Sequence, residues 1–267
     1  MTKYYYRTKN RFAFTLNELY LAMLLVVIIG FVFSKEASSN TQNKITVDKI
    51  QSTYKMLEFA VNKWQEENNC SDDVRLCIQD ERNIGKDNKI IFNGIAKYLP
   101  VVASNVNLDV KNRHINGQDM EKIDWLPVYT KTFNGNLQKN STIGVSKYFD
   151  KNSKNLSFYK LRDGVTILVD FSDYDFDSGV GFFDINGKEG DNQIGIDVFP
   201  FSIGSSVDED HKLYEATAKK LNPYFSSAKY DIYDLCNINV NDCTKEKLLT
   251  NPTYYVLKWS KLPQKIF

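Results

Sequence analysis

The segment from Phe14 to Phe33 restricts the fold of this chain more than any other feature. Its twenty residues include only three strongly polar ones, which are Thr15, Asn17 and Glu18. A helix of this length spans about 30 Å at about 1.5 Å per residue, which matches the hydrocarbon core of a bilayer. Four basic residues and no acidic ones precede it, namely Lys3, Arg7, Lys9 and Arg11. Because basic flanks stay in the cytoplasm, the sequence predicts one membrane pass, with the later residues outside the cytoplasm.

Glu18 is the residue of this segment that an ordinary export signal does not explain. A secretory signal peptide would be cut after its apolar run, near Ser39, and a signal anchor would remain in the bilayer. Neither needs a carboxylate close to the start of the apolar run. A charged side chain in hydrocarbon is costly, so it usually has a partner or a role.

The residues around Glu18 follow a pattern that is known from one family. A basic leader ends at Ala13, the sequence Phe14-Thr15-Leu16-Asn17-Glu18 follows, and an apolar run continues to Phe33. This order resembles the prepilin signal of type IV pilins and of type II secretion pseudopilins. It departs from the commonest form in two ways. Alanine rather than glycine precedes the cut, and Lys35 stands where many pilins have proline.

The resemblance implies a processing step, a set of partners and a location. A prepilin peptidase would cut between Ala13 and Phe14 and methylate the new N-terminal amine, so that the apolar helix stays in the mature chain. Glu18 would then pair with the N-terminal amine of a neighbouring pilin or pseudopilin subunit during assembly. The other implied partner is an assembly platform in the bacterial inner membrane. The N-terminus would lie in the cytoplasm and the globular domain outside it, in a periplasmic or extracellular filament.

A second helical pattern follows the polar stretch at residues 34–43. Apolar residues recur at spacings of three and four, at Val47, Ile50, Tyr54, Leu57, Val61 and Trp64. This spacing places them on one face of a helix, which we expect to end at Asn68-Asn69. A coiled-coil seam is the alternative, but the stripe is short for one. We therefore favour packing of this face into a globular core.

The later part of the sequence predicts an antiparallel β-sheet. The clearest hairpin is LSFYKLRDGVTILVDF at residues 156–171, in which Asp163-Gly164 has the residues of a primed turn. Further strand candidates are GVGFF, DVFPFSI and an extended run at Tyr254–Leu257. A long helix followed by an antiparallel meander is an α+β fold, and pilin-like proteins share this plan.

These patterns divide the chain into four parts. We expect a leader at residues 1–13, a membrane-spanning or filament-core helix at 14–34, an amphipathic continuation of this helix at 35–69, and an extracytoplasmic α+β domain at 70–267. The second half of the long helix would pack on the sheet of the domain that follows it.

The sequence DINGKEGDNQIGID at residues 184–197 concentrates oxygen-bearing side chains among three glycines. Such loops suit Ca²⁺, which prefers oxygen ligands, and some pseudopilins hold calcium in a late loop. The EF-hand pattern fails, because Lys188 and Gly195 stand where acidic residues are needed. Asp and Asn also stabilise turns by bonding to their own backbone. We favour a structural turn, with calcium bound by Asp184, Asn186 and Asp191 as the alternative, and no other cofactor is indicated.

The four cysteines form two pairs with the same spacing, Cys70 with Cys77 and Cys236 with Cys243. Four cysteines allow three pairings, and a location outside the cytoplasm permits disulfides. The C-x6-C spacing does not fit a zinc ribbon. We expect two local disulfides, with free or cross-paired thiols as the alternative.

Charge and motif content limit the classes of function. The formal net charge of +1 gives no reason to expect a nucleic acid as partner. The two histidines, His114 and His211, lie in no metal or triad pattern, and the sequence contains no nucleophile elbow, phosphate loop or paired-carboxylate pattern. Together with this absence of catalytic motifs, the prepilin resemblance implies a structural filament subunit without catalysis of its own. The alternative is an exported or signal-anchored binding domain that does not assemble into filaments.

Overall fold

A computed structural model gives the structure of the chain. It describes residues 16–110, 113–118, 156–171, 178–187, 195–204, 219–223, 252–260 and 262. The chain divides into two units, Met1–Lys44 and Ile45–Phe267. Helix α1 (Leu16–Glu67) belongs to both, and its backbone is helical through residues 34–43. The polar stretch at these residues therefore does not interrupt the helix.

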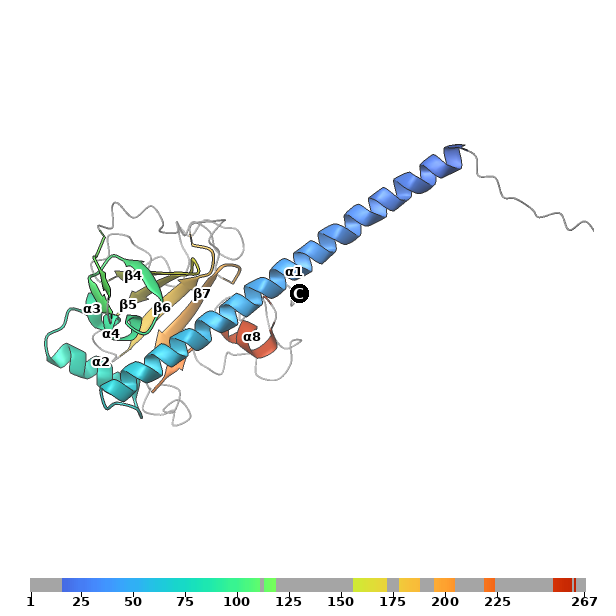
Figure 1. The fold of residues 1–267 in the computed structure, drawn as a ribbon. Coiled ribbons are helices and arrows are strands. Elements are labelled where there is room, and N and C mark those ends of the chain that lie inside the picture. The colour runs from blue at the N-terminus through green and yellow to red at the C-terminus, as the bar shows by residue number, and fades with distance from the viewer. Residues whose placement is uncertain are drawn as a thin grey trace, which may run out of the picture. The chain divides into compact units, whose positions relative to one another are not determined.

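The second unit contains an antiparallel sheet and several short helices (Figure 1). Among the described residues, six strands pair in the order β1-β4-β5-β6-β7-β8, and β2 and β3 form a separate pair. The strands are β1 (Val101–Ser104), β2 (Leu108–Val110), β3 (Arg113–Ile115), β4 (Leu156–Leu161), β5 (Thr166–Asp170), β6 (Gly179–Asp184), β7 (Val198–Ile203) and β8 (Leu221–Asn222). The short helices are α2 (Val74–Asn83), α3 (Asn88–Ile91), α4 (Asn93–Ala96) and α8 (Pro252–Trp259). This combination confirms the predicted α+β class.

The part of α1 from Ile45 onward packs its predicted face into the core of the second unit. The six stripe residues, from Val47 to Trp64, are each at most 8% exposed. They belong to the same hydrophobic cluster as Ile167, Phe183 and Phe201 of the sheet. The interpretation of this stripe as a core face is confirmed. Removal of its apolar surface from water stabilises the contact between helix and sheet.

Helix α1 ends where the sequence predicts. Asn69 has a φ of 56°, a left-handed conformation that asparagine tolerates better than most residues. The Cys70 amide donates to the Gln65 carbonyl at 3.1 Å, and the side-chain amide of Asn68 donates to the Trp64 carbonyl at 2.7 Å. These bonds satisfy carbonyl groups that the last turn of a helix leaves open.

The β4–β5 hairpin forms as predicted, but its turn differs. The Leu161 amide donates to the Val165 carbonyl at 2.8 Å, and the Gly164 amide donates to the Leu161 carbonyl at 3.1 Å. Gly164 has a φ of 89°, whereas Asp163 has no positive φ. Both primed turn types need a positive φ at the first central residue, which would be Asp163, so the prediction of a primed turn is wrong. The geometry is that of a three-residue loop with glycine in the left-handed position.

The Phe201 ring on strand β7 fills the space left by Gly181 on strand β6. Gly181 pairs with Phe201, and a Cβ atom at Gly181 would lie 2.3 Å from the Phe201 ring. Phe199 and Phe201 in turn stack near Phe183, with ring centroids 5.7 and 6.3 Å from it. A larger residue at position 181 would displace the Phe201 ring from this cluster.

Candidate assembly and ligand sites

The first described part of α1 carries a run of exposed apolar side chains. Every residue from Tyr20 to Ile29 is exposed, and the large apolar ones are 48–71% exposed. These are Tyr20, Leu21, Met23, Leu24, Leu25, Val26, Val27, Ile28 and Ile29. At about 1.5 Å per residue the run covers about 15 Å of helix. Since the apolar residues lie all around the helix rather than on one stripe, the run suits a helix that is enclosed on every side.

The predicted processing and assembly residues precede this run. Ala13 and Phe14 lie outside the described residues. Glu18 belongs to α1 by its backbone, two residues before the exposed run begins. Within the part of the chain that the structure describes, no helix combines the length and the apolar character that crossing a membrane requires.

Residues 184–197, which we call the Asp184 loop, begin at the end of strand β6. Two carboxylates among the described residues of this loop, Asp184 and Asp197, are buried. Asp184 is fully buried, and its Oδ1 accepts from the amides of Asn186 at 3.1 Å and Gly187 at 2.8 Å. The Ile185 amide donates to the Asp197 carbonyl at 2.9 Å, and Asn186 Nδ2 lies 3.5 Å from Asp197 Oδ2. This is an Asp-centred turn, which agrees with the structural turn favoured from the sequence.

Calcium binding at this loop stays a prediction. Asp184 and Asn186 are close together, but Asp191, the third predicted ligand, lies outside the described residues. Among the residues that are described, no three or more His, Cys, Asp or Glu side chains gather in a way that would hold a metal ion.

Lys49 joins helix α1 to two turns of the sheet. Its ammonium group donates to the Asp163 carbonyl at 3.2 Å and also to the Ile185 carbonyl. The first carbonyl belongs to the β4–β5 turn and the second to the Asp184 loop. Lys49 is not among the residues predicted from the sequence, because a lone lysine next to the apolar Ile50 does not indicate which distant groups it contacts. A lysine there can pack its stem on apolar surface while its charged end reaches polar groups.

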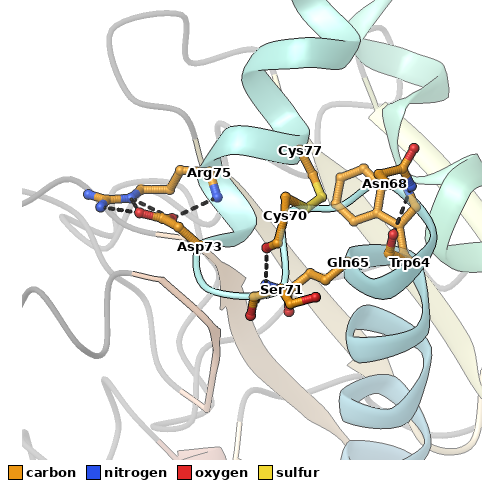
Figure 2. The surroundings of a disulfide bond; sticks show 8 residues. All are labelled: Trp64, Gln65, Asn68, Cys70, Ser71, Asp73, Arg75 and Cys77. Carbon is orange, nitrogen blue, oxygen red and sulfur yellow. Dashed lines mark hydrogen bonds and ion pairs between the residues drawn. A yellow bond between two sulfur atoms is a disulfide. The ribbon is translucent and has the colours of Figure 1, made fainter.

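A disulfide joins Cys70 and Cys77 after the end of α1 (Figure 2). Both cysteines are buried, and their Cα atoms are 5.7 Å apart. This is the local pairing that the spacing predicts. Cys236 and Cys243 lie outside the described residues. The bridge holds the start of α2 close to the last turn of α1.

Asp73 and Arg75 fix the start of α2 beside this disulfide (Figure 2). The Asp73 carboxylate accepts from the Arg75 amide at 3.0 Å, as a helix N-cap does. The Arg75 guanidinium also donates to both carboxylate oxygens, at distances of 2.5–3.1 Å. Burial acts to raise the pKa of Asp73, but the hydrogen bonds and the charge of Arg75 outweigh burial and hold the pKa below its ordinary value.

No family model, curated protein or solved structure matches this chain. Covering the exposed apolar run would be strongly favourable, because each Å² of apolar surface removed from water is worth about 25 cal/mol.

Proposed function

We propose that this chain is a structural subunit of a filament of the type IV pilus or type II secretion pseudopilus class. It assembles through the N-terminal part of α1 after a prepilin peptidase has cut between Ala13 and Phe14. Its role is mechanical, and it has no catalysis of its own. Before assembly the chain resides in the bacterial inner membrane with its globular domain outside the cytoplasm, where an assembly platform and other subunits act on it.

The observation that carries this proposal is the exposed apolar run from Tyr20 to Ile29. Apolar surface of this extent is removed from water either by lipid or by other helices. A filament subunit uses both, first in the membrane and then among neighbouring subunits. A signal peptide, in contrast, is discarded and needs no continuous link to the domain that follows it.

The continuity of α1 supports the same role. The helix runs from Leu16 to Glu67 without a break, and its later face belongs to the core of the second unit. One helix therefore carries both the apolar run and the anchor of the globular domain. Lys49 adds polar ties between this anchor and the sheet. Load applied to the apolar run would pass into the domain through covalent backbone and a buried face, as a filament subunit requires.

Glu18 gives the proposed assembly its register. An unpaired carboxylate among packed helices is costly, whereas a carboxylate that faces the Phe14 ammonium of a neighbour is compensated. An ammonium group at a helix N-terminus is itself unfavourable and favours a nearby anion. Such a pair would set how far each subunit is offset from the next.

The variant Glu18→Ala tests this proposal, with Asn17→Ala as the matched control, because Asn17 is the adjacent polar residue and is exposed. Glu18→Ala is expected to leave export, the cut after Ala13 and the folding of the domain intact. It should lower the share of the chain in sheared filaments by about tenfold or more, since each 1.4 kcal/mol of lost pairing is about tenfold in an equilibrium constant. Asn17→Ala should assemble normally.

Cell fractionation into membrane and sheared filament material gives the result. Normal incorporation of a processed Glu18→Ala chain would contradict the assembly role of the carboxylate. A wild-type chain that is never found in filaments would favour the alternative, an exported or signal-anchored binding domain.

A further inference from the structure

The outer edge of strand β7 is only partly covered by β8. β8 pairs with Ser202 and Ile203 at the end of β7. On that side, the residues from Val198 to Phe201 therefore have no partner strand among the described residues. A strand edge with unpaired N–H and C=O groups is a template for pairing with another molecule. Another strand can pair here only if the backbone N–H and C=O groups on this side of β7 have no hydrogen-bond partner within the chain.

The outward carbonyl groups of this edge are already used within the chain. Along a strand, every second residue directs its N–H and C=O to the same side, so Val198 and Pro200 share the side on which Ser202 pairs with β8. The Val198 carbonyl accepts from the Gly195 amide at 2.9 Å. The Pro200 carbonyl accepts from the Thr253 hydroxyl at 2.5 Å, and Pro200 has no N–H to donate.

Helix α8, red in Figure 1, contacts strand β7 and reaches the Pro200 carbonyl on this side. Thr253, Tyr255 and Val256 of α8 are fully buried. The residue after α8 is held as well, because the Gln51 side chain of α1 donates to the Ser260 hydroxyl at 3.0 Å. Thr253 supplies a direct polar contact between α8 and the backbone of β7.

The opposite edge of the sheet, at β1, is closed by different means. The Ser104 carbonyl accepts from the Gln118 amide at 2.9 Å, and the Val101 carbonyl accepts from the Arg113 guanidinium. The register of β1 also shifts between Val101 and Ala103, and such an irregularity hinders pairing with a further strand. The β1 edge is thus closed by the chain that follows it directly, whereas the β7 edge depends on a helix that is distant in the sequence.

We propose that α8 and Pro200 together guard the β7 edge against strand addition by a second copy of this chain. The excluded occupant is a second copy because the same edge of two molecules can meet in antiparallel fashion about a two-fold axis. Pro200 removes a donor from the middle of the edge, and Thr253 holds α8 over the carbonyl of the same residue. The guard is independent of the filament role proposed for α1.

Full-length variants in one detergent solution test the guard. Thr253→Val keeps the shape of threonine but removes the hydroxyl donor, and Pro200→Val restores an outward N–H. The double variant Thr253→Val with Pro200→Val removes both parts of the guard. The control, Thr253→Ser with Pro200→Val, restores the N–H but keeps the hydroxyl. All variants share α1, so association through α1 is common to them.

Only the double Val variant is expected to gain a new self-association. Sedimentation equilibrium should give an association constant about tenfold or more above that of either single variant, as expected for coupled sites. Hydrogen exchange should show concentration-dependent protection at Val198 and at position 200 in this variant, since these two positions face the outer side, while unchanged protection of β4 and β5 reports an intact fold. Thr253→Val alone should already speed exchange in α8, which tests the hydroxyl even where the double variant does not fold.

Three results would overturn the guard. The first is equal association of the double variant and the single variants when β4 and β5 keep their protection. The second is self-association of the control, Thr253→Ser with Pro200→Val, that is as strong as that of the double Val variant. This would show that the hydroxyl contact of α8 does not limit strand addition. The third is unchanged exchange of α8 in Thr253→Val.

Discussion

Replacement of Trp64 by alanine tests the contact between α1 and the globular core. Trp64 is 1% exposed, and the backbone of α4 lies directly against its ring, since a Cβ atom on Gly94 would be 2.3 Å from Trp64 Nε1. The cavity left by the ring is bounded by helical backbone of α1 and α4, which limits its collapse. Truncation of a buried tryptophan to alanine costs about 3–5 kcal/mol. Limited collapse favours the upper part of that range.

Urea melts measure the change in the free energy of unfolding. The chain used lacks residues 1–40 and retains the whole buried face of α1 from Val47 onward. Far-UV circular dichroism is the readout, because Trp64 itself contributes to the fluorescence. A loss of about 4 kcal/mol, at a slope of about 2–3 kcal/mol per M, lowers the urea midpoint by about 1–2 M. Since domains are stable by only about 5–15 kcal/mol, this is a large share of the total.

Phe59→Ala is the matched control on the same helix, because the Phe59 ring is 55% exposed. This variant should change the free energy of unfolding by no more than about 0.5 kcal/mol. An unchanged midpoint for Trp64→Ala would refute the burial of this face. An equal loss in Trp64→Ala and Phe59→Ala would show that the face assigned to solvent is buried as well.

Two further predictions concern α2 and the Asp184 loop. Asp73→Ala removes the N-cap of α2 and should cost about 1 kcal/mol. Because Arg75 holds the pKa of Asp73 below its ordinary value, this contribution is present above that ordinary value and is lost as pH falls through the lowered pKa. Thermal melts of both chains at neutral and at strongly acidic pH check this, and an equal difference at both would contradict it. Calcium bound by Asp184, Asn186 and Asp191 in the folded state should raise the melting temperature, and if neither millimolar calcium nor a chelator changes it, the loop is only a turn.

The later half of α1 was predictable because one strong pattern decides it. The stripe from Val47 to Trp64 repeats with helical period over several turns, and no strand places these residues on one side. The end of the helix was also predictable, since Asn69 is suited to the left-handed conformation that stops it. The β4–β5 hairpin followed from two apolar runs around Gly164, although the sequence alone did not fix the type of turn.

Helix α8 forms although several of its residues prefer strands. The sequence predicts an extended run at Tyr254–Leu257, because Tyr and Val favour strands, and this prediction is wrong. Pro252 stands at the first position of the helix, where proline is well tolerated, so the sequence also contains a signal for a helix start there. Thr253 and Val256 are fully buried in the helix that contacts β7, so that tertiary packing outweighs the preference of the residues themselves.

The polar ties between distant segments had no signal in the sequence. Lys49 reaches the carbonyls of Asp163 and Ile185, which lie 114 and 136 residues further along the chain. Thr253 reaches Pro200 across 53 residues. Such contacts depend on the rotation of a helix and on the register of a sheet, and a lone lysine or threonine indicates neither. The motif at Ala13 to Glu18, in contrast, is read from the sequence alone.

Mass spectrometry of the N-terminus of the chain isolated from cell membranes tests the central proposal most directly. A filament subunit of the prepilin class should begin at Phe14, with a methylated amine, and should retain the apolar run from Tyr20 to Ile29. The position of the cut separates this class from an ordinary secreted domain without any assumption about filaments. A mature chain that begins near Ser39, and so lacks the apolar run, would contradict the proposed function.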